Sequence, residues 1–202
     1  MANKNKGKKK EKRKIVRKTN VVLKKKKKKW TSLLAPKTFG GGEIGESLII
    51  DSQELIGRRV ISSLSSFNRG RNTSIKVIFE GKEIVEGACV CEPKGYYILN
   101  SFARRIVKKG KTKVFQSLKL KTKDNVDVVI KIVLVTRKKI SRGTATSLRE
   151  ALSKFLSESV KKGTFESNLD SIINYSFQKK IKENMKKVYP VGSLEIVLFK
   201  KA

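Results

Sequence analysis

Few side chains in this sequence could carry acid–base, nucleophilic or metal chemistry. No histidine occurs among the 202 residues, which removes the commonest general base and metal ligand. Glu43 and Glu46 flank a loop, and Asp124 and Asp127 lie around a turn. Charge balance and turn formation explain both acidic pairs better than catalysis does. We therefore predict no catalytic site, no metal site, no cofactor and no small-molecule substrate.

Two further features resemble functional sites but have simpler explanations. The glycines at 40–42 and 45 could suggest a phosphate-binding loop, but the segment lacks the Gly-Lys-Ser/Thr ending of a P-loop and follows no predicted strand. Cys89 and Cys91 are separated by one residue, so in a strand both side chains point the same way. Without histidine there is no set of partners for zinc, and we predict two buried, reduced thiols.

The abundant functional side chains in this sequence are the cationic ones, lysine and arginine. The formal net charge is +32 and the pI is near 10.3. Sixteen of the first 29 residues are Lys or Arg and only Glu11 is acidic, and this arm ends in the unbroken run 24–29. The remaining residues carry +17 of their own. Charge of this density needs a polyanion to neutralise it, and the usual one is nucleic acid.

The basic residues beyond the arm gather in clusters at predicted turns and helix ends. Lysine outnumbers arginine and few aromatic residues are interleaved, a composition that favours contact with phosphates over base readout. One such cluster, of five lysines, lies within residues 179–187. The residues that we predict to bind RNA are Lys24, Lys25, Lys26, Lys27, Lys28, Lys29, Trp30, Lys37, Arg58, Arg59, Arg69, Arg71, Arg104, Arg105, Lys108, Lys109, Lys111, Arg137, Lys138, Lys139 and Arg142.

Two other classes of protein also bind polyanions. A polybasic arm attracts anionic lipid, but no amphipathic helix adjoins this one, and Ala2 stands where myristoylation requires glycine. No run approaches the roughly 18 apolar residues of a membrane span, and the N-terminus lacks the apolar stretch of a secretory signal. An independent chromatin or nucleoid protein stays open as the alternative, although such tails usually flank a small helical module.

The strands and helices that must position the basic clusters fit within a single domain. We expect a disordered basic arm over residues 1–29 and one domain over 30–202. Residues 30–47 predict a loop-like segment anchored by Trp30 and Phe39. Alternating patterns predict strands over 60–67, 73–79, 82–91, 111–121 and 126–137, and a last one around 194–198.

Helical periodicity predicts amphipathic helices over 97–109, 148–162 and 169–188. Ser147 with Glu150 matches a capping box for the second helix, and Gly163 supplies its stop. Short meandering strands favour a sheet curled toward a barrel. The fold class that we predict is α+β, with a mainly antiparallel, barrel-like core and about three packed helices.

Several short motifs follow one another along the chain. Lys28, Trp30, Ala35-Pro36, Phe39 and Gly45-Glu46-Ser47 open the series; then come Ile56-Gly57-Arg58, the basic run 104–109, Lys121-Thr122-Lys123-Asp124, and Tyr189-Pro190. Their order and spacing over residues 28–200 resemble the archaeal and eukaryotic small-subunit ribosomal protein S-one family, called S-three-a in animals. The chain departs from that pattern at Thr31, where tyrosine is usual, and at 197–199, where basic residues are usual. Its length is similar to that of archaeal members.

The resemblance implies a structural constituent of the small ribosomal subunit, not an enzyme. It implies a barrel-like domain with packed helices on the platform of the subunit, near the messenger exit. The partners that it implies are small-subunit rRNA and neighbouring small-subunit ribosomal proteins, with messenger RNA near the exit as a further one. Membership also implies a cytoplasmic location on the ribosome, with no membrane partner.

Overall fold

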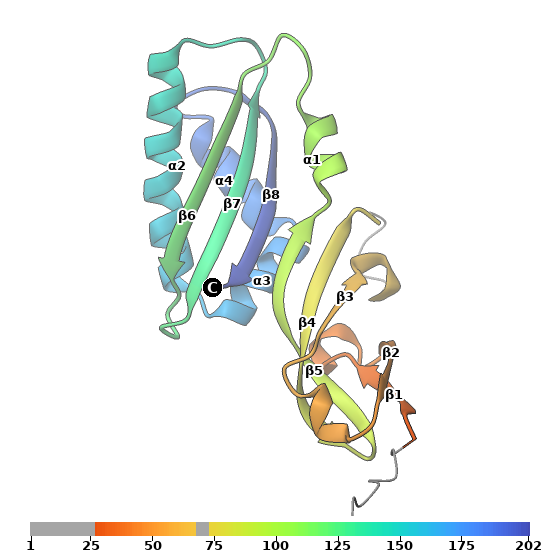
Figure 1. The fold of residues 1–202 in the computed structure, drawn as a ribbon. Coiled ribbons are helices and arrows are strands. Elements are labelled where there is room, and N and C mark those ends of the chain that lie inside the picture. The colour runs from red at the N-terminus through yellow and green to blue at the C-terminus, as the bar shows by residue number, and fades with distance from the viewer. Residues whose placement is uncertain (1–26, 68–72) are drawn as a thin grey trace, which may run out of the picture.

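The computed structural model describes residues 27–67 and 73–202 (Figure 1). The expected arm up to residue 26 and the expected turn at 68–70 lie outside the described residues. The described residues form eight strands and four α-helices, and the strands belong to one mostly antiparallel sheet. The predicted α+β class is confirmed.

The first five strands curl around an aromatic core, and we call residues 30–98 the N-terminal half. Phe39, Phe67 and Phe79 meet edge to face with ring centroids 5.3–5.8 Å apart, the geometry that ring quadrupoles favour. The predicted barrel-like curl is found here. The elements are β1 (Lys29–Leu34), β2 (Glu43–Ile49), β3 (Arg59–Ser63), β4 (Ile75–Val85) and β5 (Ala88–Ile98), with short 3₁₀ turns at Lys37–Phe39, Ser52–Leu55 and Leu64–Phe67.

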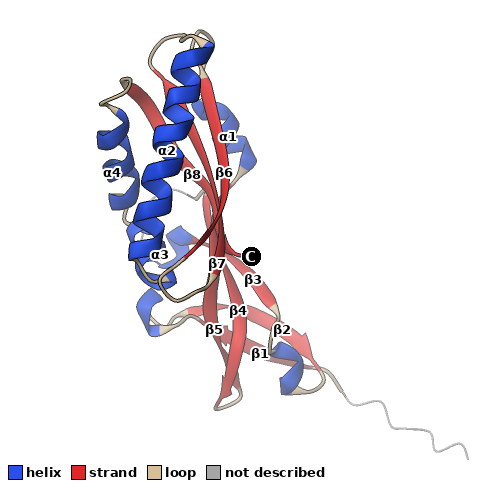
Figure 2. Ribbon diagram, turned by 90° about the vertical axis from the view of Figure 1, so that its left-hand side faces the viewer, coloured by secondary structure: helices blue, strands red, loops and turns tan. Residues whose placement is uncertain are grey.

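The C-terminal half, residues 99–202, is a three-stranded sheet with helices on both faces. Three helices, α2, α3 and α4, cover one face, and the short α1 lies on the other side (Figure 2). Antiparallel pairing runs from β6 to β7 and from β7 to β8. The elements are α1 (Asn100–Ile106), β6 (Lys113–Lys121), β7 (Asp127–Thr136), α2 (Arg142–Lys162), α3 (Phe165–Ile173), α4 (Ser176–Met185) and β8 (Val191–Lys201).

Two matching apolar patterns build the core of this half. Alternate residues of β7 are buried toward the helices, and every fourth residue of α2 faces them. Burying each of these aliphatic side chains stabilises the fold by about 1.5–3 kcal/mol. All are at most 1% exposed: Val128, Ile130, Ile132 and Leu134 on β7, and Leu148, Leu152, Leu156 and Val160 on α2.

The two halves meet along a short ladder in the middle of the sheet. The strand order is β2-β1-β5-β8-β7-β6, with β4 on the other edge of β5 and β3 beyond it. Three residue pairs join β5 to β8, beginning with Gly95 and Lys200. A Cβ added at Gly95 would lie 2.7 Å from the Cβ of Lys200 and 2.9 Å from the carbonyl oxygen of Phe199. Glycine therefore allows the two strands to come together.

The prediction that residues 30–47 are loop-like is wrong. They form most of a hairpin in which Trp30 pairs with Leu48, while the glycines at 40 and 41 make only its turn, with φ of 92° and 65°. Those left-handed angles suit glycine. Phe39 is buried as expected, but Trp30 is 68% exposed and does not anchor the segment to the domain.

The helix predictions need three corrections. The helix predicted over 97–109 spans only Asn100–Ile106, because β5 continues to Ile98. The helix with the capping box starts earlier, since Ser141 caps it by accepting the N–H of Thr144 at 3.3 Å. The predicted third helix, over 169–188, is two helices. They are separated at Tyr175, whose φ of 64° cannot continue a right-handed helix.

Candidate nucleic-acid interface

Net charge is distributed unequally between the two halves. Residues 30–98 contain eight Lys and Arg against eight Asp and Glu, so the N-terminal half is formally neutral. Residues 99–202 contain 25 against eight, so the whole +17 of the domain belongs to the C-terminal half. The domain's own contribution to the long-range field that attracts a polyanion therefore arises from the C-terminal half.

Three loops of the C-terminal half gather at one end of its sheet, at the top of Figure 1. They follow α1, β7 and α4. Thr136, the last residue of β7, pairs with Val191, the first residue of β8, and this pairing brings the second and third loops together. Nine exposed basic residues on these loops make up what we call the basic end: Lys108, Lys109, Lys111, Arg137, Lys138, Lys139, Arg142, Lys186 and Lys187.

A buried threonine fixes the first two loops to each other. Thr136 is fully buried, and its N–H donates to the carbonyl of Thr112 at 3.0 Å, while its hydroxyl oxygen accepts the Thr112 N–H at 3.1 Å. The same hydroxyl lies 2.6 Å from the Lys138 carbonyl oxygen, and the Thr112 hydroxyl accepts the N–H of Ile140 at 3.1 Å. The backbone that carries the lysines is thus held in place before any ligand binds.

The cations of the basic end are uncompensated. None of the nine forms an ion pair with a carboxylate of the described residues. The N-terminus of α2, capped by Ser141, opens at the same end and adds the positive pole of a 21-residue helix. Arg104 and Arg105 stand exposed in the last turn of α1, beside this surface. The arrangement suits phosphate groups, which take up both point charges and helix N-termini.

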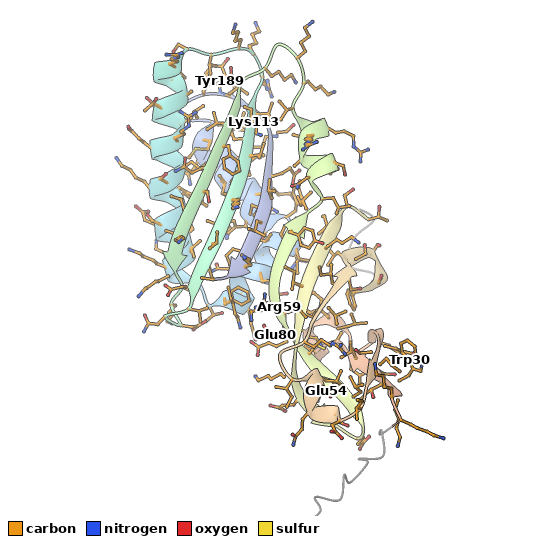
Figure 3. The ribbon with its side chains drawn as sticks, in the orientation of Figure 1. Trp30, Glu54, Arg59, Glu80, Lys113 and Tyr189 are labelled. Atoms are coloured by element: carbon orange, nitrogen blue, oxygen red, sulfur yellow. The ribbon has the colours of Figure 1, made fainter. Side chains whose placement is uncertain are left out.

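Arg58 and Arg59, predicted to bind RNA, lie apart from the basic end. Figure 3 shows Arg59 beside Glu80, whereas Lys113 and Tyr189 lie toward the opposite end of the molecule. Arg59 is 3.9 Å from Glu80, and Arg58 donates to the hydroxyl of Ser47. These two arginines therefore already have partners within the N-terminal half.

Two acids of this half, Glu80 and Glu92, are paired with lysines. Lys94 also contacts Glu80, and Glu92 accepts from Lys201 at 2.7 Å and lies 3.2 Å from Lys82. The hydrogen bond from Lys201 holds the pKa of Glu92 below its usual range. Local pairing thus occupies these two carboxylates, one of them partly through Lys201 of the C-terminal half.

The remaining predicted RNA-binding residues divide into two groups. Lys27, Lys28 and Lys29, which lead into the N-terminal half, and Trp30 and Lys37 within it, are exposed and lie away from the basic end. The others lie outside the described residues: Lys24, Lys25, Lys26, Arg69 and Arg71.

No catalytic arrangement is found in the part of the chain that the structure describes. No group of three or more Cys, Asp or Glu side chains there is placed to hold a metal ion. Cys89 and Cys91 are free and buried, as predicted, and burial raises the pKa of Cys91 to about 12, which suppresses its thiolate. None of the described helices has the length and apolar character needed to cross a membrane.

A sequence model of the Ribosomal S3Ae family matches residues 16–201, almost the whole chain. The chain belongs to this family. Similar proteins include the small ribosomal subunit protein eS1 of Picrophilus torridus, 32% identical over 83% of this chain and 80% of the relative. The eS1 proteins of Nanoarchaeum equitans and Halorubrum lacusprofundi are 30% and 26% identical, over 80% and 83% of this chain and 82% and 79% of the relatives.

Membership in the Ribosomal S3Ae family confirms the resemblance found in the sequence. It identifies the chain as a structural ribosomal protein, not an enzyme. Lys186 and Lys187 belonged to a cluster noticed in the sequence but were not among the predicted RNA-binding residues. Summing charge over residues 30–98 and 99–202 would have pointed toward them, because it excludes the N-terminal half as the source of the excess.

Proposed function

We propose that this chain is a structural constituent of the small ribosomal subunit and binds small-subunit rRNA through the basic end. The observation that carries the proposal is the gathering of nine exposed, unpaired cations from three loops in a member of a ribosomal protein family. The name of the similar proteins, small ribosomal subunit protein eS1, supports the choice of subunit.

Phosphate contact is the interaction that the basic end supports. Seven of its nine cations are lysines, which act as compact point charges and lack the planar fork of arginine. Each contact releases counterions from the RNA, which supplies affinity that falls with salt. Because Thr136 and Thr112 already hold two of the loops, binding needs little further ordering of the backbone.

The basic arm, residues 1–29, adds a second rRNA contact in this proposal. The arm becomes ordered on the RNA, and the favourable free energy of its binding comes from counterion release. It enters the fold at β1, in the N-terminal half, whereas the basic end lies at the opposite end of the molecule (Figure 1). The arm and the basic end would therefore hold different segments of rRNA.

The family resemblance supports a finer placement within the ribosome. We place the protein on the platform near the messenger exit of the cytoplasmic ribosome. Neighbouring ribosomal proteins, and messenger RNA near the exit, are its further partners. We assign the protein neighbours to the neutral N-terminal half, where Trp30 and Leu48 stand exposed on one face of the β1–β2 hairpin.

Two matched triple variants test the rRNA contact. Replacing Arg137, Lys138 and Lys139 by glutamine removes three cations of the basic end, and replacing Lys37, Arg58 and Arg59 removes three from the N-terminal half. We expect the first variant to reduce the slope of log affinity for small-subunit rRNA against log salt by about 2–3, since each contact contributes about 0.7–0.9. The second variant should change the slope by less than about 1.

Equal losses from the two triple variants would contradict the assignment to the basic end. Sedimentation of a cell lysate tests the subunit itself, because the protein should migrate with small subunits through a moderate-salt wash. Release into a DNA-bound fraction would support the chromatin alternative.

A further inference from the structure

A hollow of about 280 Å³ lies between α1 and the face of the β6–β7–β8 sheet that the other helices leave free. Its apolar lining is made by Ala103 of α1, Val133 of β7 and Val197 of β8. Val133 is only 3% exposed, so α1 and the strands already keep water from this part of the sheet. Such a surface accepts a flat apolar group.

The side of the hollow on β6 is an exposed aromatic ring. Phe115 is 45% exposed and lies opposite Val133 in the β6–β7 register. The ammonium of Lys113 stands 5.8 Å from the centre of its ring, within cation–π range. An aromatic face on a sheet, with a cation beside it, is the combination on which nucleic-acid bases stack.

The surroundings of the hollow are cationic. Arg104 of α1 and Lys113 of β6 line it together with Phe115, and no carboxylate is among its lining residues. Three further lysines, Lys119, Lys131 and Lys200, follow down the same face of the sheet, as the strand register places them. This pattern supplies positions for several phosphates around one aromatic ring.

The acid that the strand register places beside the hollow, Glu195, carries a reduced negative charge. Glu195 pairs with Val133 in the β7–β8 register, and its carboxyl accepts a hydrogen bond from the hydroxyl of Tyr175. Burial raises the pKa of Glu195 to about 7, so the carboxyl is about half protonated near neutral pH. It therefore opposes a phosphate on the neighbouring strand less than a fully ionised carboxyl would.

We infer that this hollow binds an unpaired nucleotide of small-subunit rRNA, with its base stacked on Phe115 and its phosphates against Lys113 and Arg104. The inference rests on the proposed rRNA binding and adds a contact to a base. Lys113 begins β6 directly after the first loop of the basic end, so a strand leaving that end reaches the hollow next. A base within a duplex has both faces covered by its neighbours, so the ring of Phe115 selects an unstacked one.

The test uses the full chain with one substitution at a time. Phe115→Leu keeps an apolar side chain of similar exposure but removes the aromatic face, and Phe115→Tyr restores that face. We expect Phe115→Leu to weaken binding to small-subunit rRNA by about tenfold and Phe115→Tyr to bind like the unsubstituted chain. Ile61→Ala, at a 52% exposed position of the N-terminal half, is the matched control and should leave affinity unchanged.

Two further readouts separate stacking from phosphate contact and from misfolding. The slope of log affinity against log salt should stay the same in Phe115→Leu, because no charge is removed. Chemical probing of the bound rRNA should show an unpaired base that the unsubstituted chain protects and Phe115→Leu exposes. Thermal unfolding of the variant should match that of the unsubstituted chain.

Unchanged rRNA affinity in Phe115→Leu, with the basic-end triple variant still weakened, would overturn this inference and leave the proposed function intact. Failure of the triple variant to weaken binding would instead count against the proposed function. A loss seen only with an unstructured oligoribonucleotide, and not with rRNA, would overturn the assignment of the nucleotide to rRNA.

Discussion

The two halves of the protein share one sheet but differ in how their charged side chains are paired. In the N-terminal half, Glu80 and Glu92 each contact two cations, and the formal charge sums to zero. In the C-terminal half, nine cations at one end have no described carboxylate as partner. The difference teaches that the partners of a basic residue, more than its presence in the sequence, decide whether it is available to an external polyanion.

The largest expected effect comes from removing the arm, which leaves the two halves to be compared directly. Residues 2–26 contain 13 Lys and Arg and one acid. Deleting them should lower the slope of log rRNA affinity against log salt by about 5 if six of these cations contact phosphates. The slope that remains belongs to the C-terminal half, so the basic-end triple variant should reduce it again. An unchanged slope after the deletion would remove the arm from the binding mechanism.

A smaller effect is expected where the two halves are joined. Gly95→Ala places a methyl group against Lys200 and the backbone of Phe199, and we expect it to destabilise the fold by about 1–3 kcal/mol. Gly45→Ala, on β2, is the control, because nothing lies within 4 Å of an added Cβ there. Urea unfolding followed by hydrogen exchange of the β4 and β5 amides and by helical circular dichroism reports on each half separately.

The two transitions should coincide in the unsubstituted chain, since one contiguous core spans both halves. If Gly95→Ala weakens the joint, the transitions should move apart. If Gly95→Ala proved as stable as the Gly45→Ala control, the β5–β8 contact would be shown to tolerate a side chain.

The smallest effects concern one carboxyl in each half, with opposite dependence on pH. The pKa of Glu92 is lowered in the fold, so the stability that it contributes is present above about pH 4.5 and is lost on acidification. The pKa of Glu195 is raised to about 7, so the stability that its ionisation costs is nil below about pH 4.5, grows between about pH 4.5 and 7, and stays constant at higher pH.

Melting temperatures measured from pH 3 to pH 8 check both directions. Relative to the unsubstituted chain, Glu195→Gln should melt about 2–4 °C higher at pH 8 and equally at pH 4. Glu92→Gln should melt about 2–4 °C lower at pH 7, with the difference vanishing near pH 3. If both variants shift in the same direction at pH 8, the two carboxyls do not differ as described.

The sequence predicted features that depend on local patterns. The alternation in β7 and the four-residue spacing of leucines in α2 reflect burial on one face; β7 formed where expected, and α2 includes its predicted residues but begins at Arg142. The prediction of a loop over residues 30–47 was wrong because its glycines suggested a loop, whereas they make only the turn of a hairpin. The prediction of one helix over residues 169–188 was wrong because tyrosine rarely adopts a left-handed φ. Nothing local to Tyr175 therefore indicated a break between α3 and α4.

The candidate site was less predictable because it depends on distant partners. Arg58-Arg59 and Arg137-Lys138 look alike in the sequence, but among the described residues Arg59 meets a carboxylate, Glu80, across the β3–β4 ladder, and the second pair meets none. The position of the basic end depends on Thr136 bonding to Thr112, 24 residues away. Phe115 carries no sequence signal of its own, since any β6 residue could face either side until the register with β7 is known.

The position of β8 has a consequence for how the protein is made. This strand comes last in the sequence, at Val191–Lys201, yet it lies between β5 and β7 and links the two halves. Until it emerges, the facing edges of β5 and β7 remain unpaired and open to other strands. We therefore expect the nascent chain to hold two separate, incomplete units that join only after residues 191–201 have been synthesised, and an early-binding polyanion or chaperone to protect them meanwhile.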